Sequence, residues 1–267
     1  MITEPGTIDD LVADAAAAGY GVTKRLVHDW VAKGLLAQPK RRRTAQRGSE
    51  KALHSGAQRT LFLSLLAKRP TATVRPLAEF VVVCWLFIND DDFIGPQQAI
   101  RALRTYVGDP RGSQAWARER AAGFVQPLCD PRLGTARSRR ELLKAFANAF
   151  YTGTYDRGDL IAKCAPQFED KMAFREVLRS LRRGPVPGQP ESLLLHLDVV
   201  LQAGKAVQDG DVDQELLMEA RTQYLRLRTP DWGPTQSDYD MAMGLLLVGI
   251  GTLLLYRTGE LGHPALA

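Results

Sequence analysis

Four side chains that could bind a nucleic acid stand close together in the chain, at Lys24, Arg25, His28 and Lys33. Cations bind phosphate oxygens, and arginine can also donate two hydrogen bonds to the edge of a guanine base. Thr23 precedes them and is typical of a helix N-cap, since its hydroxyl can accept a bond from a free N–H of the first turn. The cluster predicts a short helix whose outer face contacts DNA.

The same segment has an apolar face that would hold this helix in place. The side chains that recur there at helical spacing are Leu26, Val27, Trp30 and Val31. Gly34 follows, and glycine readily adopts the left-handed conformation that ends many helices. A packed face opposite a basic face suits a major-groove reader, so we expect Thr23 to Lys33 to dock in the major groove of double-stranded DNA.

Another helix of the same domain is predicted just before the segment from Thr23 to Lys33. Thr7 to Asp10 has the form of a capping box with aspartate in place of glutamate. The apolar side chains of that helix are Ile8, Leu11, Val12 and Ala15. The turn at residues 19–21 is short enough to set two helices at a steep angle. Together these features predict a helix-turn-helix.

A basic loop follows, from Pro39 to Gly48, and no acid occurs in it before Glu50. Its cations are Lys40, Arg41, Arg42, Arg43 and Arg47. Each cation that neutralises a phosphate releases a counterion, so this composition suits contact with a DNA backbone or an adjacent minor groove. We expect a small two-stranded wing here, and a solvated basic loop is the alternative.

Val22 to Leu36 resembles the recognition helix of the MerR-type winged helix-turn-helix proteins. Thr23 takes the place of the family's capping serine, Trp30 that of its second aromatic residue, and Gly34-Leu35-Leu36 closes the motif. Arg25 matches a position where many members carry an arginine that contacts DNA. The resemblance covers roughly the first 105 residues.

The resemblance implies a sequence-specific transcriptional regulator that binds double-stranded DNA. Its expected partners are a second copy of the chain, RNA polymerase and a small-molecule effector. The family dimerises through one long coiled coil, but no sustained heptad run occurs here, so a homodimer needs another surface.

Two further functions fit the same residues. The first is an architectural, excisionase-like DNA-binding protein of a mobile element. The second is a winged protein-interaction module without DNA binding. His28 and Asp29 favour the second, because the family usually has arginine and tyrosine at these positions.

The charge of the chain is unevenly distributed. The net charge is +5, but residues 1–75 carry 13 Lys and Arg against 6 Asp and Glu, which leaves −2 for the remainder. The basic surplus therefore belongs to the predicted DNA-binding end, as expected if nucleic acid is the partner of that end.

The remainder of the chain is predicted to be helical. We expect a mainly α fold, with a winged helix-turn-helix domain in residues 1–75, a helical region in 76–183 and a C-terminal helical region in 191–267. Residues 70–76 and 184–190 are rich in proline and are predicted linkers.

Two strongly apolar segments are predicted to be buried helices. Leu77 to Ile88 is expected to be a buried helix, although its apolar run could also be a strand. Met241 to Tyr256 is uncharged but too short to span a bilayer, so a buried core or dimer-interface helix is expected.

Chemistry of other kinds has little support. The cysteines Cys84, Cys129 and Cys164 lack zinc-type spacing, and Asn89 to Asp92 lacks the calcium-loop pattern and predicts a turn. The familiar nucleotide-binding, hydrolase and metalloprotease motifs are missing. We therefore expect no enzyme activity, no catalytic residues, no metal and no cofactor.

The start of the chain is unlike a signal peptide, so a cytoplasmic protein without a membrane partner is expected.

Overall fold

The computed structural model describes residues 2–40, 51–88, 90–91, 93–108, 113–180, 188–227 and 236–259. Helices make up 73% of the structure, so the predicted mainly α character is confirmed. The predicted two-stranded wing is wrong, because the described residues contain only isolated β-bridges and no strand.

The chain divides into two compact units, each built from separate segments. Unit 1 comprises Met1–Gly108 and Ala206–Leu253, and unit 2 comprises Asp109–Lys205 and Leu254–Ala267. The predicted division into domains 1–75, 76–183 and 191–267 stays a prediction.

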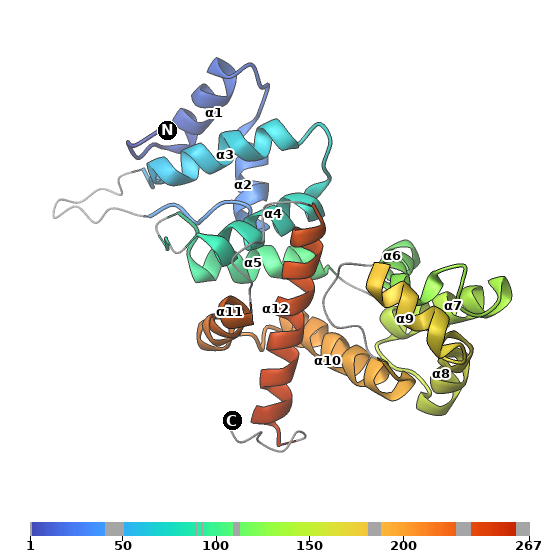
Figure 1. Ribbon diagram of the computed structural model, residues 1–267. Coiled ribbons are helices and arrows are strands. Elements are labelled where there is room, and N and C mark those ends of the chain that lie inside the picture. The colour runs from blue at the N-terminus through green and yellow to red at the C-terminus, as the bar shows by residue number, and fades with distance from the viewer. Residues whose placement is uncertain are drawn as a thin grey trace. The chain divides into compact units, whose positions relative to one another are not determined.

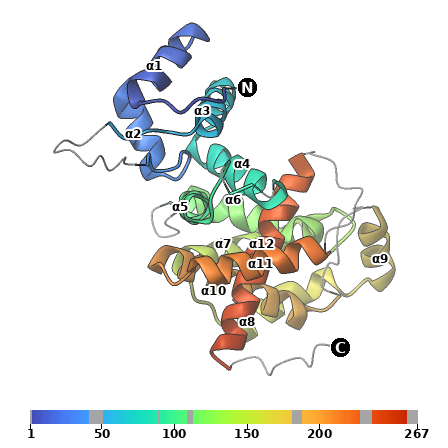
Figure 2. The ribbon, with the colours of Figure 1, turned by 90° about the vertical axis from the view of Figure 1, so that its left-hand side faces the viewer.

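Unit 1 holds the N-terminal helices and part of the C-terminal ones. They are α1 (Ile8–Ala17), α2 (Lys24–Ala32), α3 (Gly56–Lys68), α4 (Val74–Phe87), α5 (Pro96–Val107), α11 (Gln214–Leu227) and most of α12 (Gln236–Arg257). Figures 1 and 2 show α1, α2 and α3 side by side at one end of this unit, followed by α4 and α5 packed on each other. Its largest fully buried side chains include Trp30, Phe62 and Trp85.

Helix starts in unit 1 follow local capping chemistry. The Thr7 hydroxyl accepts a bond from the Asp10 N–H, and the Asp10 carboxylate accepts one from the Thr7 N–H, so the predicted capping box is confirmed. The predicted linker at 70–76 is partly wrong, because α4 already begins at Val74. Pro76 fits within its first turn, where no intrahelical N–H bond is lost. The helical prediction for 77–88 is confirmed for all but Ile88, which caps α4.

The uncharged C-terminal stretch lies in α12, as predicted. Leu246, Leu247 and Ile250 are buried to 2% exposure or less, which confirms a core position. Within the described part of the chain, no helix combines the length and apolarity needed to cross a membrane.

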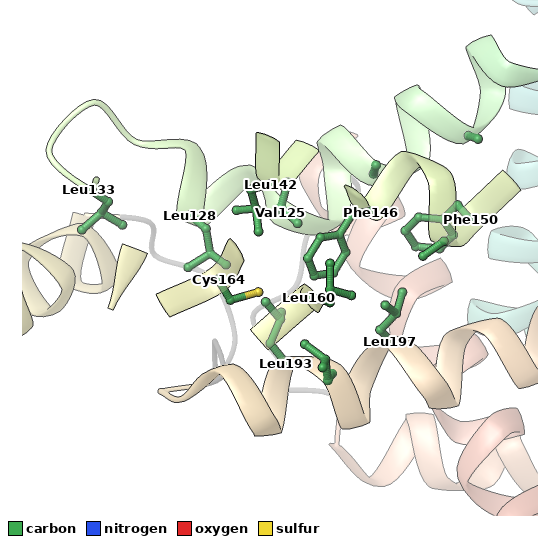
Figure 3. Packing of buried hydrophobic residues seen from close by; sticks show 14 of the residues in the cluster. Val125, Leu128, Leu133, Leu142, Phe146, Phe150, Leu160, Cys164, Leu193 and Leu197 are labelled. Atoms are coloured by element: carbon green, nitrogen blue, oxygen red, sulfur yellow. The ribbon is translucent and has the colours of Figure 1, made fainter. Parts of the chain in front are cut away.

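Unit 2 is a helical body around an apolar interior. Its elements are α6 (Gln114–Val125), the 3₁₀ turn η2 (Gln126–Cys129), α7 (Ala136–Thr152), α8 (Arg157–Cys164), the 3₁₀ turn η3 (Ala165–Gln167), α9 (Lys171–Ser180) and most of α10 (Pro190–Asp209). Side chains from α6, α7, α8 and α10 point into one cluster, which includes Val125, Phe146, Leu160 and Leu197 (Figure 3). Helix α7 contributes Leu142, Phe146 and Phe150 to this interior.

Helix starts in unit 2 also follow local chemistry. Thr135 and Ser138 form a reciprocal cap, and α7 begins at Ala136. Pro190 was predicted to lie in a linker, yet it is the first residue of α10. Proline is favourable at that position because its missing N–H would have no helical partner there.

Candidate nucleic-acid interface

The helix predicted to enter the major groove is α2. The Thr23 hydroxyl accepts a hydrogen bond from the Leu26 N–H at 3.4 Å, so the predicted N-cap is confirmed. Val27 and Trp30 are buried, and the Trp30 ring packs edge-on against Phe62 of α3 with 5.5 Å between ring centroids. The inner face of α2 is thus fixed by apolar packing.

The outer face of α2 presents Arg25 and His28 to solvent. Arg25 forms no ion pair with any carboxylate in the described part of the chain. Both side chains lie within the first turn and a half of the helix, so they can approach a ligand together. Arg25 and His28 are two of the predicted contact residues, and both are exposed on the same part of α2.

The two lysines of the predicted site are neutralised by neighbouring acids. Lys24 pairs with Asp9 of α1, which also lies 3.3 Å from Lys51. Lys33 Nζ lies 2.8 Å from Asp29 Oδ2. The Lys24 hydrogen bond is the main reason that the pKa of Asp9 is lowered. Exposed ion pairs of this kind contribute little to stability because water and salt screen them, so a phosphate can replace the carboxylate.

These ion pairs were not part of the sequence prediction. The Asp29–Lys33 spacing of four residues is typical of a pair on one helix and could have been recognised. The Asp9–Lys24 pair joins two helices, so it depends on how α1 packs on α2.

Backbone hydrogen bonds join the chain on the two sides of the basic loop, and we call the four residues Gly6, Lys40, Leu53 and His54 that form them the clip. Lys40 and Leu53 exchange N–H···O bonds of 2.9 and 3.0 Å, and Gly6 and His54 exchange bonds of 2.9 and 2.8 Å. Arg41, Arg42, Arg43 and Arg47 lie outside the described residues. The clip fixes the two ends of the loop beside α1.

Backbone pairing near this clip is limited to isolated bridges in the described residues. Lys40 pairs with Leu53, and Gly6 pairs with His54. The Ala37 N–H donates to the Gln58 side chain at 2.7 Å, so the segment between α2 and Lys40 is held by a side chain of α3 and not by a partner strand. The rest of the predicted wing, residues 41–50, lies outside the described residues.

Two buried amides hold the C-terminal end of the recognition segment. Gln58 Oε1 accepts from Ala37, while Gln58 Nε2 donates to Phe93 O and to Gln98 Oε1, the latter at 2.9 Å. Gln98 Nε2 in turn donates to Leu35 O at 3.2 Å. Both glutamines are at most 3% exposed. The sequence analysis missed them, since no local pattern distinguishes a buried glutamine from a surface one.

Gly34 ends the recognition helix with φ +73°, as its predicted left-handed conformation requires. A Cβ atom there would lie 2.3 Å from the Ala102 backbone N of α5. The Thr105 hydroxyl of α5 also donates to the Lys33 carbonyl at 2.8 Å. The end of α2 is thus held by glycine-mediated contact with α5, which no other residue type could make without displacement.

His54 belongs to the clip, and its side chain is buried, with 3% exposure. Burial lowers the pKa of His54, and the charge of His28 lowers it further. Its Nδ1 has no hydrogen-bond partner. The imidazole is therefore held in its neutral form next to the predicted contact face.

The described residues provide little for other chemistry. They contain no group of three His, Cys, Asp or Glu that could hold a metal ion. Asp90 O accepts bonds from the Phe93 and Ile94 N–H groups, which confirms a turn in the predicted 89–92 segment, although Asn89 and Asp92 lie outside the description. Burial raises the pKa of Cys84 to about 11 and that of Cys164 to about 12, so neither thiol is poised as a nucleophile.

A shallow groove of about 330 Å³ lies between α7 and α8 of unit 2. Its charged lining side chains are largely paired, as in Lys163 with Asp159 and Glu141 with Arg137. Asp198 accepts from Tyr155 beside it and lies 3.1 Å from Arg157. Carboxylates engaged in this way are poor general bases, so the groove has no evident catalytic group.

No family model, curated protein or solved structure matches the chain. The resemblance to the MerR-type proteins therefore stays a prediction from the sequence.

Proposed function

We propose that the chain is a DNA-binding transcriptional regulator that docks α2 in a major groove. Arg25 contacts a base edge or a phosphate, with Thr23, Lys24, His28 and Lys33 beside it. The basic loop from Lys40 to Arg47 lies along adjacent phosphates and supplies affinity rather than sequence choice.

One observation carries this proposal. Arg25 and His28 are exposed together on a helix whose opposite face is anchored by the buried Trp30. The clip between Lys40 and Leu53 adds support, because it holds both ends of the loop in the unit that contains this helix.

Specificity favours a homodimer. A single small module buries little surface on DNA, whereas a two-fold dimer reads two half-sites about one helical turn apart. RNA polymerase and a small-molecule effector are the further partners that regulation of transcription would involve.

The salt dependence of DNA binding tests the proposal. Fluorescence anisotropy with a labelled mixed-sequence duplex should detect binding at about 50 mM salt, where even nonspecific contacts persist. Changing Lys40, Arg41, Arg42, Arg43 and Arg47 to alanine should weaken binding and flatten the slope of log affinity against log salt. Each lost phosphate contact should reduce this slope by about 0.9. An unchanged slope and affinity would remove the basic loop from the interface.

A protein-interaction module without DNA binding is the second candidate. The pairing of Lys24 with Asp9 and of Lys33 with Asp29 favours it, because these ion pairs reduce the positive charge of the predicted face. This candidate predicts no anisotropy change at low salt, whereas the proposed regulator predicts a large one.

A further inference from the structure

Within the part of unit 1 that the structure describes, the buried Arg221 forms no ion pair. Arg221 of α11 is 3% exposed, and its Nη2 donates to the Ile88 carbonyl at 2.9 Å. Its Nε–H has no acceptor. Burial lowers the pKa of Arg221, and the charge of Asp91 opposes that effect without an ion pair between them. A guanidinium nevertheless stays protonated in proteins, so a positive charge remains inside the unit.

A second buried donor lies in the same cluster. The Arg221 guanidinium stacks over the Trp85 ring, with 4.8 Å from Cζ to the ring centroid. Trp85 is fully buried, and its indole N–H also has no acceptor. Buried donors in folded proteins nearly always have a partner. Two of them beside an unpaired charge indicate that an acceptor from outside the chain completes the site.

We propose that this cluster, formed by Trp85 and Arg221, binds the carboxylate of a small apolar acid. The two oxygens of a carboxylate can accept from the Arg221 Nε–H and from the Trp85 indole N–H, and its single charge adds less to that of the nearby Asp91 than a phosphate dianion would. The surroundings favour an apolar body on the acid. Phe87 and Tyr224 form an edge-to-face ring pair there, with centroids 6.1 Å apart.

Exposed apolar side chains adjoin the cluster along the chain. In the described part of unit 1, the large hydrophobic residues exposed to solvent are Ile88, at 41%, and Leu225, at 42%. Ile88 supplies the carbonyl that Arg221 holds, and Leu225 lies one turn beyond Arg221 on α11.

The Arg221 side chain and the side chain that holds the segment after α2 bond to carbonyls only five residues apart in the chain. Arg221 holds the carbonyl of Ile88, and five residues further along, the carbonyl of Phe93 is held by Gln58. The same Gln58 side chain fixes Ala37 beyond the end of α2. Regulation of DNA affinity by the bound acid rests on the proposed function, whereas binding of the acid does not.

The test of the site uses the full-length protein, with benzoate as the probe carboxylate. At ten times its Kd, benzoate should raise the melting temperature by roughly 3–6 °C relative to sodium chloride of equal ionic strength. Inorganic phosphate should give no such rise. The Arg221→Met variant should lose the effect, while Arg226→Met, at an exposed position of the same helix, should keep it.

A direct measurement covers the case in which Arg221→Met does not fold. In the wild-type protein, the ¹⁵N–¹H resonance of the Arg221 side-chain Nε should shift on titration with benzoate. The proposal is overturned if the melting temperature and this resonance do not respond. It is also overturned if phosphate acts as strongly as benzoate, or if a folded Arg221→Met variant responds like the wild type.

Regulation has its own measurement. Saturating benzoate should change the DNA affinity of the wild type at least about five-fold, and DNA should change the benzoate affinity by the same factor. An unchanged DNA affinity overturns the regulatory part alone. A protein that binds benzoate but no DNA would contradict the proposed function and leave the carboxylate site standing.

Discussion

The interiors of the two units differ in chemistry. In the described part of the chain, unit 1 buries His54, Gln58, Gln98 and Arg221, whereas unit 2 buries Gln167 as its polar residue. The interior of unit 2 otherwise consists of apolar side chains such as Phe146 and Leu160 (Figure 3).

This difference shows which parts of the two units have their backbone position fixed by buried hydrogen bonds. Apolar packing tolerates many combinations of similar volume, but a buried polar network accepts only the geometry in which every donor finds its acceptor. Gln58 and Gln98 use that property to fix the segment that follows α2. Buried polar side chains therefore fix specific segments of unit 1, whereas apolar packing holds the described part of unit 2 together.

The largest expected effect on stability is at Phe146, in the apolar interior of unit 2. Phe146 is fully buried and lies 5.5 Å from Phe124, measured between ring centroids. Phe146→Ala should lower the free energy of unfolding of unit 2 by about 3–5 kcal/mol, because a large cavity is left behind. Met172→Ala, at a side chain that is 66% exposed, should change it by less than about 0.5 kcal/mol. Denaturant titration measures both, and equal effects would contradict a packed core around Phe146.

A smaller but more specific effect is expected at Gln58. Gln58→Leu keeps the volume but leaves the Ala37 N–H and the Phe93 carbonyl without their partners. The free energy of unfolding should fall by about 2–3 kcal/mol, and DNA affinity should fall with it. Gln38→Leu, at an exposed position nearby, serves as the control. Unchanged stability in Gln58→Leu would show that the network does not position the recognition segment.

The smallest effect on stability is a pH dependence from His54. Burial holds its pKa below the ordinary value of 6.5, so the unfolded chain binds the proton more readily. The stability contributed by neutral His54 is complete above about pH 6.5 and is lost as the pH falls from there toward the lowered pKa. The slope should reach at most about 1.4 kcal/mol per pH unit. His54→Leu should flatten unfolding curves measured across this window, and an unchanged slope would contradict the assignment.

Local patterns in the sequence predicted the local structure well. The Thr7 and Thr23 caps, the packing of Trp30 and the left-handed Gly34 follow from short-range chemistry and are confirmed. The predicted wing strands were wrong, because Lys40 and Leu53 form an isolated bridge and the Ala37 N–H bonds to the distant Gln58 side chain, a long-range contact that no local pattern indicates.

Long-range partners were beyond a reading of the sequence. Arg59 forms a two-point ion pair with Asp14, at 2.7 and 2.8 Å, and 45 residues separate them. Arg221 lies 133 residues from the Ile88 carbonyl that it contacts. Only the tertiary fold brings such groups together, so the buried polar side of the comparison could not be foreseen.

DNA binding by Arg25→Ala tests the central claim most directly, measured by anisotropy against Arg69→Ala as the matched control. Both arginines are exposed, but Arg25 lies on α2 and Arg69 caps the C-terminal end of α3. Arg25→Ala should weaken binding by about 1–3 kcal/mol, or 5- to 150-fold, at an unchanged melting temperature, and Arg69→Ala should bind like the wild type. Equal affinities for the two variants, or unfolding of Arg25→Ala, would contradict the assignment of α2 as the DNA-reading helix.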